Sequence, residues 1–189
     1  MTELKYSAGM VSKPFWFHEF SRVIELLHEG NSFNDIRKKV IDDNIFLMEK
    51  EYRALEIYNK TAARAKALPK PLIDIFCGAD LGSKKCIAIL AVMLTDKLFF
   101  EFMYEVYREK ILIGMPEIST SEIVIFFKNK QMKSPILAAW KDYTLKKLSN
   151  SYMNYMVDSG LASRTKEFSK LTPPLLDIDF ENCLIDCKL

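Results

Sequence analysis

Hydrophobic residues recur at helical spacing near the start of the chain. Phe17, Phe20 and Ile24 lie three or four residues apart, which is the spacing of one helix face. We therefore expect a helix from an N-cap at Ser12 to a stop at Gly30.

Two more helices are predicted before residue 70. Ser32 and Asp35 form the pattern of a capping box, with Asp in the usual place of Glu, and open a short helix. An apolar connector at residues 45–48 leads to a long helix over about 49–68, which Pro69 closes.

The helices predicted in the middle of the chain are apolar around most of their circumference. We expect a short helix at 71–77, an apolar segment at 86–94 and an aromatic-rich helix at 96–113. A helix that is apolar around most of its circumference belongs inside a bundle.

The C-terminal third repeats the order of a short and a long helix. Residues 119–131 predict a helix, although the run at 123–127 also has strand propensity. Ser134-Pro135 is a good N-cap and first-turn pair for a long helix that runs to about residue 158. Residues 161–172 are less regular and fit a short β wing.

These patterns predict an all-α fold, a globular helical bundle with two helix-turn-helix-like elements and a short β wing near 161–172. Six glycines and seven prolines are too few for the turns of a sandwich or barrel. We divide the chain into an N-terminal helical region (1–70), central apolar helices (71–118) and a C-terminal region (119–189), all within one compact unit.

Composition points to a cytoplasmic protein. Hydrophobic residues make up 49% of the 189 positions, but the longest apolar run, Cys86–Leu94, is nine residues long. A bilayer span needs about 20. The first residues lack the apolar stretch of a secretory signal, and four cysteines fit a reducing compartment.

Charge is distributed unevenly, although the net charge is only +2. Residues 31–70 hold nine basic and six acidic side chains, a net +3, and residues 119–170 hold nine and four, a net +5. Residues 171–189 hold one basic and four acidic side chains, a net −3. Two basic regions indicate a polyanionic partner.

In a helix-turn-helix, a short helix supports a second helix whose N-terminal residues enter the DNA major groove. Both basic regions have this order of helices, so we expect double-stranded DNA as the partner. Solvated faces of ordinary bundle helices are the alternative. The candidate DNA-binding residues are Lys50, Arg53, Lys60, Arg64, Lys128, Lys130, Lys133, Lys141 and Lys147.

Residues suited to catalysis or metal binding do not gather in the sequence. His18 and His28 are about 80° apart on one predicted helix, and Cys183 and Cys187 lack the second pair that a zinc site needs. No phosphate-binding or nucleophile motif is present. We therefore expect no cofactor, no metal and no enzymatic activity.

Two stretches resemble a known family. The opening Lys5-Tyr6-Ser7-Ala8-Gly9 is followed by an apolar helix that carries Glu19 and stops at Gly30. The second stretch runs from Asn44 to Leu68 and includes Arg53, Ile57 and Arg64. Together with the length, they resemble the BrxA family of BREX (bacteriophage exclusion) systems across nearly the whole chain.

The resemblance implies an all-helical, monomeric, cytoplasmic protein with two helix-turn-helix elements that binds double-stranded DNA. It also implies service in a phage-defence system, with other BREX proteins as further partners. Family members have been compared with the helical antitermination factor NusB, which implies RNA binding as an alternative.

An adaptor role within the same defence complex is a further alternative. It rests on the acidic tail at 171–189, in which Leu175, Leu176, Phe180 and Leu184 have the pattern of exposed apolar side chains.

Overall fold

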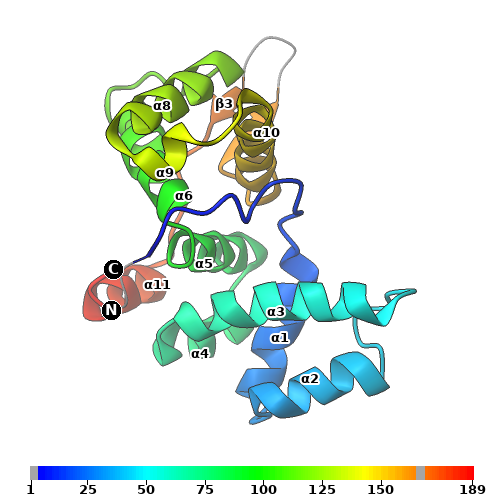
Figure 1. Cartoon of the computed structure of the whole chain (residues 1–189). Helices are drawn as coiled ribbons and strands as arrows, with labels where there is room; N and C mark the ends of the chain where they lie inside the picture. Colours follow the sequence, from blue (N-terminus) through cyan, green and yellow to red (C-terminus); the bar gives the residue numbers. More distant parts are fainter. Residues whose placement is uncertain (1–3, 165–168) are drawn as a thin grey trace. The chain divides into compact units, whose positions relative to one another are not determined.

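The computed structural model describes residues 4–164 and 169–189, which form two compact units. The first unit combines Met1–Phe15 with Asp96–Pro174, and the second combines Trp16–Thr95 with Leu175–Leu189. These boundaries differ from the division at residues 70 and 118, because each end of the chain packs with a distant segment. Figure 1 shows the elements of both units.

The second unit is a bundle of helices. Its elements are α1 (Phe17–His28), α2 (Phe33–Asp42), α3 (Glu51–Ala67), α4 (Lys70–Gly78), α5 (Leu81–Met93) and α11 (Ile178–Asp186). Helix α1 packs against α3, α4 and α5, and α11 packs on α4. An edge-to-face pair of Phe20 and Phe76, with centroids 5.8 Å apart, lies in this core.

Helices α2, α5 and α11 of this unit begin with a side-chain capping hydrogen bond, whereas α1, α3 and α4 do not. Ser32 and Asp35 form the expected capping box of α2. The N-cap expected at Ser12 is wrong: Phe15 and Trp16 are buried and Trp16 takes a left-handed φ of 53°, so α1 begins only at Phe17.

The first unit combines helices with a small sheet. Its elements are α6 (Lys97–Phe102), the π-helical turn η1 (Met103–Arg108), α7 (Glu109–Leu112), β1 (Glu117–Ile118), α8 (Thr120–Lys133), α9 (Pro135–Ala138), α10 (Asp142–Asp158), β2 (Ala162–Arg164) and β3 (Ser169–Leu171). The strands are antiparallel in the order β1-β3-β2. Buried aromatic rings, including Phe99, Phe102 and Tyr152, fill the core beneath α10.

The N-terminal segment belongs to this unit because its polar and aromatic groups have partners there. Tyr155 donates its hydroxyl proton to the Pro14 carbonyl, and its ring contacts Phe15. Tyr6 donates to the Glu101 carboxylate of α6.

The expected fold class is confirmed: the protein is mostly helical with a short β element. Strands β2 and β3 lie within the wing expected at 161–172, of which residues 165–168 lie outside the described part. The strand β1 was not expected. The ambiguous run at 123–127 is helical, because Ser119 and Glu122 form a capping box that starts α8.

The single long helix expected from Pro135 to residue 158 is wrong. The helix breaks after Ala138 and restarts at Asp142. The side-chain amide of Gln131 donates to the carbonyls of Leu137 and Trp140. These bonds satisfy carbonyl groups that a continuous helix would have used.

Candidate nucleic-acid interface

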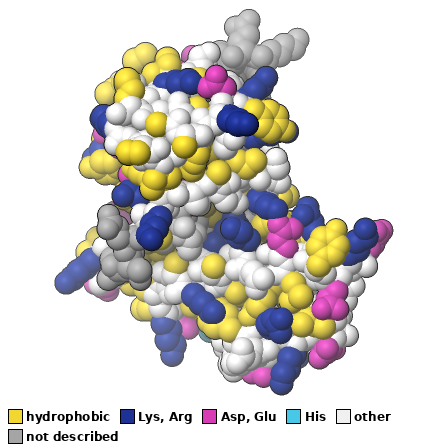
Figure 2. Space-filling view, in the orientation of Figure 1, with side chains coloured by type: hydrophobic (Ala, Val, Ile, Leu, Met, Phe, Trp, Pro, Cys, Tyr) yellow, Lys and Arg dark blue, Asp and Glu magenta, His cyan; other side chains and the backbone are white. Residues whose placement is uncertain are grey.

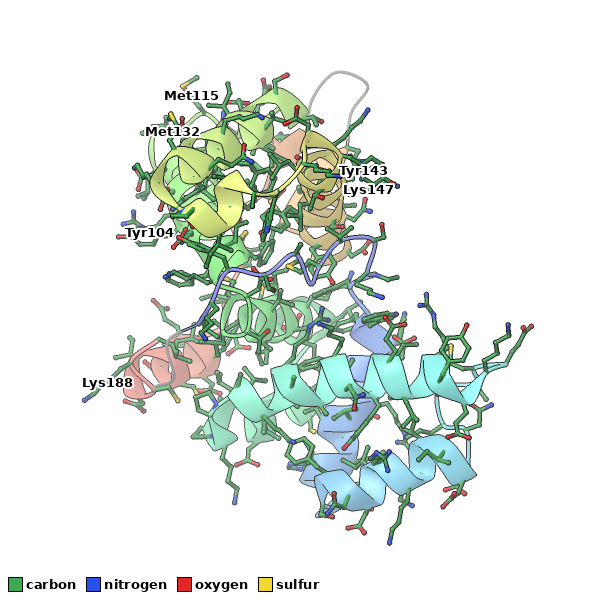
Figure 3. All side chains as sticks on the ribbon, in the orientation of Figure 1. Tyr104, Met115, Met132, Tyr143, Lys147 and Lys188 are labelled. Atoms are coloured by element: carbon green, nitrogen blue, oxygen red, sulfur yellow. The ribbon has the colours of Figure 1, made fainter. Side chains whose placement is uncertain are left out.

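The outer face of α10 is exposed and free of acidic side chains between its two ends. Leu145, Leu148 and Tyr152 are buried on the core side of the helix, so the opposite side of α10 faces solvent. Figure 3 shows Tyr143 and Lys147 on this helix. The outward polar and aromatic residues at helical spacing are Tyr143, Lys146, Lys147, Asn150 and Asn154.

The hairpin of β2 and β3 extends this face. Strand β2 packs against α10, and the Arg164 guanidinium donates a hydrogen bond to the Asn154 side-chain oxygen. In β3, Ser169 and Leu171 are buried while Lys170 points outward. Lys170 lies on the opposite face of the hairpin, because it pairs with Ser163 and Glu117 whereas Arg164 pairs with Ser169. We call the five residues on α10, together with Lys141 at its N-cap position and Arg164, the α10 face.

The start of α10 adds a favourable field for an anion. Lys141 stands at the N-cap position, and its side chain is exposed. The unpaired backbone N–H groups of a helix start carry a partial positive charge. Lys147 lies 5.4 Å from the centre of the Tyr143 ring, which orients its ammonium group along the same surface.

Lys130 is held inside the first unit. Its Nζ lies 2.6 Å from a Glu101 oxygen and 2.5 Å from a Glu105 oxygen, and its side chain is only 12% exposed. Burial alone would lower the pKa of Lys130, but the hydrogen bonds to the two carboxylates outweigh it and raise the pKa. The charge of Lys130 is compensated within the unit.

The other lysines of this region remain at the surface. Lys128 pairs with Asp142 at 2.5 Å, with both side chains exposed. Lys133 and Lys141 are exposed and form no ion pair with any residue in the described ranges. The structure thus brings Lys128, Lys141 and Lys147 to one end of α10. Lys130 does not join this surface, because it is paired with Glu101 and Glu105.

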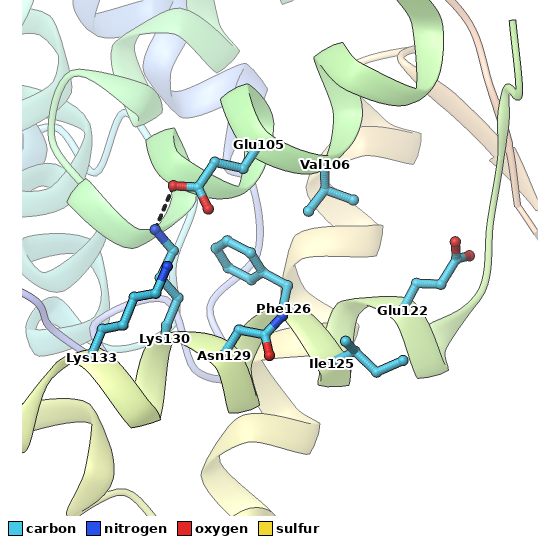
Figure 4. Close-up of a pocket in the computed structure, with 8 residues that line it drawn as sticks. All are labelled: Glu105, Val106, Glu122, Ile125, Phe126, Asn129, Lys130 and Lys133. Carbon is cyan, nitrogen blue, oxygen red and sulfur yellow. Dashed lines mark hydrogen bonds and ion pairs between the residues drawn. The ribbon is translucent and has the colours of Figure 1, made fainter. Parts of the chain in front are cut away.

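A cavity of about 330 Å³ lies between η1 and α8 (Figure 4). Glu105, Glu122, Asn129, Lys130 and Lys133 line it together with apolar groups. Burial would raise the pKa of Glu122, but the hydrogen bonds from Lys110 and Ser119 lower it overall. Two carboxylates in the lining make this cavity unfavourable for a phosphate group.

Helices α2 and α3 correspond to the first predicted helix-turn-helix-like element, but their connector is longer than expected. Eight residues, 43–50, separate the two helices, whereas a helix-turn-helix uses three or four. Lys50, Arg53 and Lys60 are exposed, and Arg53 pairs with Glu56 at 2.7 Å.

Arg64 is not exposed as expected. It is 6% exposed, because it lies seven residues after Ile57, three after Thr61 and four before Leu68, which are all buried. This position of the candidate set therefore faces the interior of the second unit.

Sequence reasoning missed Lys146, Asn150, Asn154 and Arg164. The helical spacing of the buried residues on α10 was a usable signal for the first three. Nothing local marked Arg164, because its position depends on strand pairing.

The described residues contain no group of three or more His, Cys, Asp or Glu side chains arranged to hold a metal ion. His28 lies 3.6 Å from Asp74, and both are half exposed. Burial raises the pKa of the Cys183 thiol on α11. Within residues 4–164 and 169–189, no helix has the length and apolarity to cross a membrane.

Comparisons with known proteins agree over almost the full chain. The BrxA family model matches residues 4–187. A protein of Bacillus cereus (strain H3081.97) described as "BREX protein BrxA" is 37% identical over 177 residues, covering 94% of this chain and 88% of the relative. A solved structure of an uncharacterized protein from Magnetospirillum magneticum superimposes with a TM-score of 0.81 at 16% identity, covering 97% and 93% of the two chains. That likeness concerns the fold alone.

Proposed function

This chain belongs to the BrxA family, and we propose that it serves a BREX phage-defence system as a component that binds double-stranded DNA. The observation that carries this proposal is the α10 face, a cationic surface without acids on a helix next to a β hairpin.

The order of elements supports this proposal. After β1, the helices α8, α9 and α10 are followed by the antiparallel hairpin of β2 and β3, and β3 also pairs with β1. Apart from the short helix α9, this is a strand, two helices and a hairpin. Winged helix-turn-helix domains have this order, and they place the helix before the hairpin in the major groove. By this analogy α10 is the recognition helix and the β2–β3 hairpin is the wing.

The residue types on the α10 face suit two kinds of DNA contact. Lys141, Lys146 and Lys147 are point charges that fit phosphate oxygens. Asn150 has an amide that can pair with an adenine edge in the major groove. The proposed mode is therefore phosphate binding with limited base reading.

A fluorescence anisotropy titration on a DNA duplex at two salt concentrations tests this function. Affinity should fall steeply with salt because phosphate binding releases counterions. Binding that is absent at low salt, or indifferent to salt, would contradict DNA binding. A stem-loop RNA that competes better than the duplex would favour the RNA-binding alternative.

A triple variant locates the surface. Lys141→Ala with Lys146→Ala and Lys147→Ala should weaken duplex binding roughly tenfold or more and reduce the salt slope by about 0.9 for each lysine. The matched control replaces three exposed lysines elsewhere, Lys5, Lys70 and Lys188, with alanine. Equal losses in both triples would mean that binding has no defined surface.

We extend the proposal to a non-catalytic, monomeric protein of the cytoplasm. Light scattering of the protein without a duplex should give one chain per particle.

A second candidate function, an adaptor for other BREX proteins, is favoured by the C-terminal segment. Leu175, Ile178 and Ile185 are exposed beside the acidic residues of α11. Phe180 was expected to be exposed but is buried, because it holds α11 on the second unit. Point variants Ile178→Asp and Ile185→Asp therefore test this surface better than deletion, and unchanged recovery of BREX proteins would exclude it.

A further inference from the structure

The loop between α2 and α3 presents an unusual exposed leucine. Leu47 is 87% exposed and has a left-handed φ of 53°. A branched aliphatic side chain rarely adopts this conformation, which favours glycine and asparagine. Both the exposure and the backbone conformation are unfavourable, so the position calls for a functional explanation.

The loop that carries Leu47 is held rigidly. The Asn44 side chain accepts a hydrogen bond from the Met48 N–H and donates one to the Met48 carbonyl, at 2.9 and 3.0 Å. The Leu47 N–H donates to the Asn44 carbonyl at 2.8 Å, and the Phe46 side chain is buried. A loop whose backbone is already ordered loses little backbone conformational entropy when it binds.

A second apolar group lies near the loop in the chain. Tyr52, in the first turn of α3, is 67% exposed. Tyrosine is enriched at the centres of protein interfaces, where its ring is buried against a partner.

The charges on either side of Leu47 are mostly acidic. Between residues 42 and 52 there are four acids and one base, a net −3. Figure 2 shows acidic, basic and hydrophobic side chains together at this end of the second unit. The exposed acids are Asp42, Asp43, Glu49 and Glu51. This rim repels a phosphate backbone and attracts a basic protein surface.

We propose that Leu47 and Tyr52 form a protein-docking knob that inserts into an apolar pocket with a basic rim on another protein of the BREX system. The acids around the knob pair with that rim and set the orientation of the complex. Helices α2 and α3 thus present a protein-binding element, whatever the first unit binds.

Co-purification tests the knob with the full chain. The tagged chain is expressed together with the other proteins of its BREX system, and each of those proteins is quantified after affinity purification. Leu47→Asn should reduce recovery of one BREX protein at least tenfold, whereas Leu47→Met should retain it. Asp43→Lys with Glu49→Lys should also reduce recovery, because it reverses the rim charge.

Folding and specificity are controlled separately. Asparagine adopts a left-handed φ more readily than leucine, so the thermal midpoint of Leu47→Asn should be unchanged or higher. Met132→Asn, at an exposed position of the first unit, should recover as much partner as the wild type.

Three outcomes would overturn the proposal. They are equal recovery with Leu47→Asn and the wild type, no BREX protein recovered with the wild type, and a loss of duplex affinity in Leu47→Asn without a loss of partner. The last outcome would identify Leu47 as a wedge between base pairs instead.

Discussion

Two regions of this protein share one order of elements but have different surfaces. In both, a helix with a capping box precedes a longer helix that bears lysines. The outer face of α10 has no acid between Asp142 and Asp158, and a hairpin packs beside it. The start of α3 lies beside four exposed acids and two exposed apolar side chains.

The difference shows that charge counted along a chain is not charge presented at a surface. Residues 31–70 have a net +3, yet Arg64 is buried and Arg53 pairs with Glu56. Lys130 belongs to the most basic stretch, but two carboxylates compensate it. The comparison predicts one DNA-binding face and one protein-binding face, and the variants below test it.

The largest effect should come from adding acidic side chains to α10, so that its outer face resembles the acidic start of α3. Asn150→Asp with Asn154→Asp adds two negative charges to the α10 face, and we expect duplex affinity to fall by about 30-fold at low salt. The matched control is Asn34→Asp with Asn59→Asp, at exposed positions of α2 and α3. Anisotropy titration should show less than about a twofold change in the control. Similar losses in both would remove the distinction between the two regions.

Lys130→Ala should affect stability and not DNA binding. It leaves the Glu101 and Glu105 carboxylates without their shared cation, so we expect a loss of about 1–2 kcal/mol in the free energy of unfolding. Urea denaturation measures this loss. Duplex affinity should change less than about twofold, since the two carboxylates already compensate the charge of Lys130. A tenfold loss of affinity in folded protein would return Lys130 to the DNA-binding set.

The capping box of α8 should contribute a smaller, pH-dependent stability. Ser119→Ala removes one half of the box and should cost about 1 kcal/mol at pH 7. The pKa of Glu122 is lowered in the folded protein, so its contribution is present above its unfolded pKa of about 4.3 and is lost as the pH falls through the folded pKa.

Urea denaturation from pH 7 to pH 3 checks this dependence. The difference between Ser119→Ala and the wild type should shrink below about pH 4. A constant difference would mean that the carboxylate does not take part. Ser32→Ala provides the equivalent variant in α2, where Asp35 completes the box.

The smallest effect should come from removing acids near α3. Glu49→Gln with Glu51→Gln should raise duplex affinity by about twofold to threefold at low salt, because exposed charges are strongly screened. Titration at low and physiological salt measures the gain. A gain of tenfold or more would mean that α3 is itself a DNA-binding helix held back only by these acids.

The local sequence was sufficient for most helices and for part of the candidate site. Periodic apolar residues and caps located α2, α3 and α8 because these signals act within one or two helical turns. The same periodicity would have assigned Arg64 to the interior, since it shares a face with Ile57 and Leu68. Lys146, Asn150 and Asn154 could have been found in the same way.

Only the tertiary structure decided which charged side chains remain available to bind a partner and where the long helix breaks. Lys130 meets Glu101 and Glu105 from 29 and 25 residues away, and the sheet joins β1 to β3 across about fifty residues. The break at residues 139–141 follows from the bonds of Gln131. A pattern of hydrophobic and polar residues indicates which side of a helix or strand is buried, and it therefore predicts where the helices and strands lie. It does not record which distant polar group will satisfy a given charge or carbonyl, because that depends on how the elements pack.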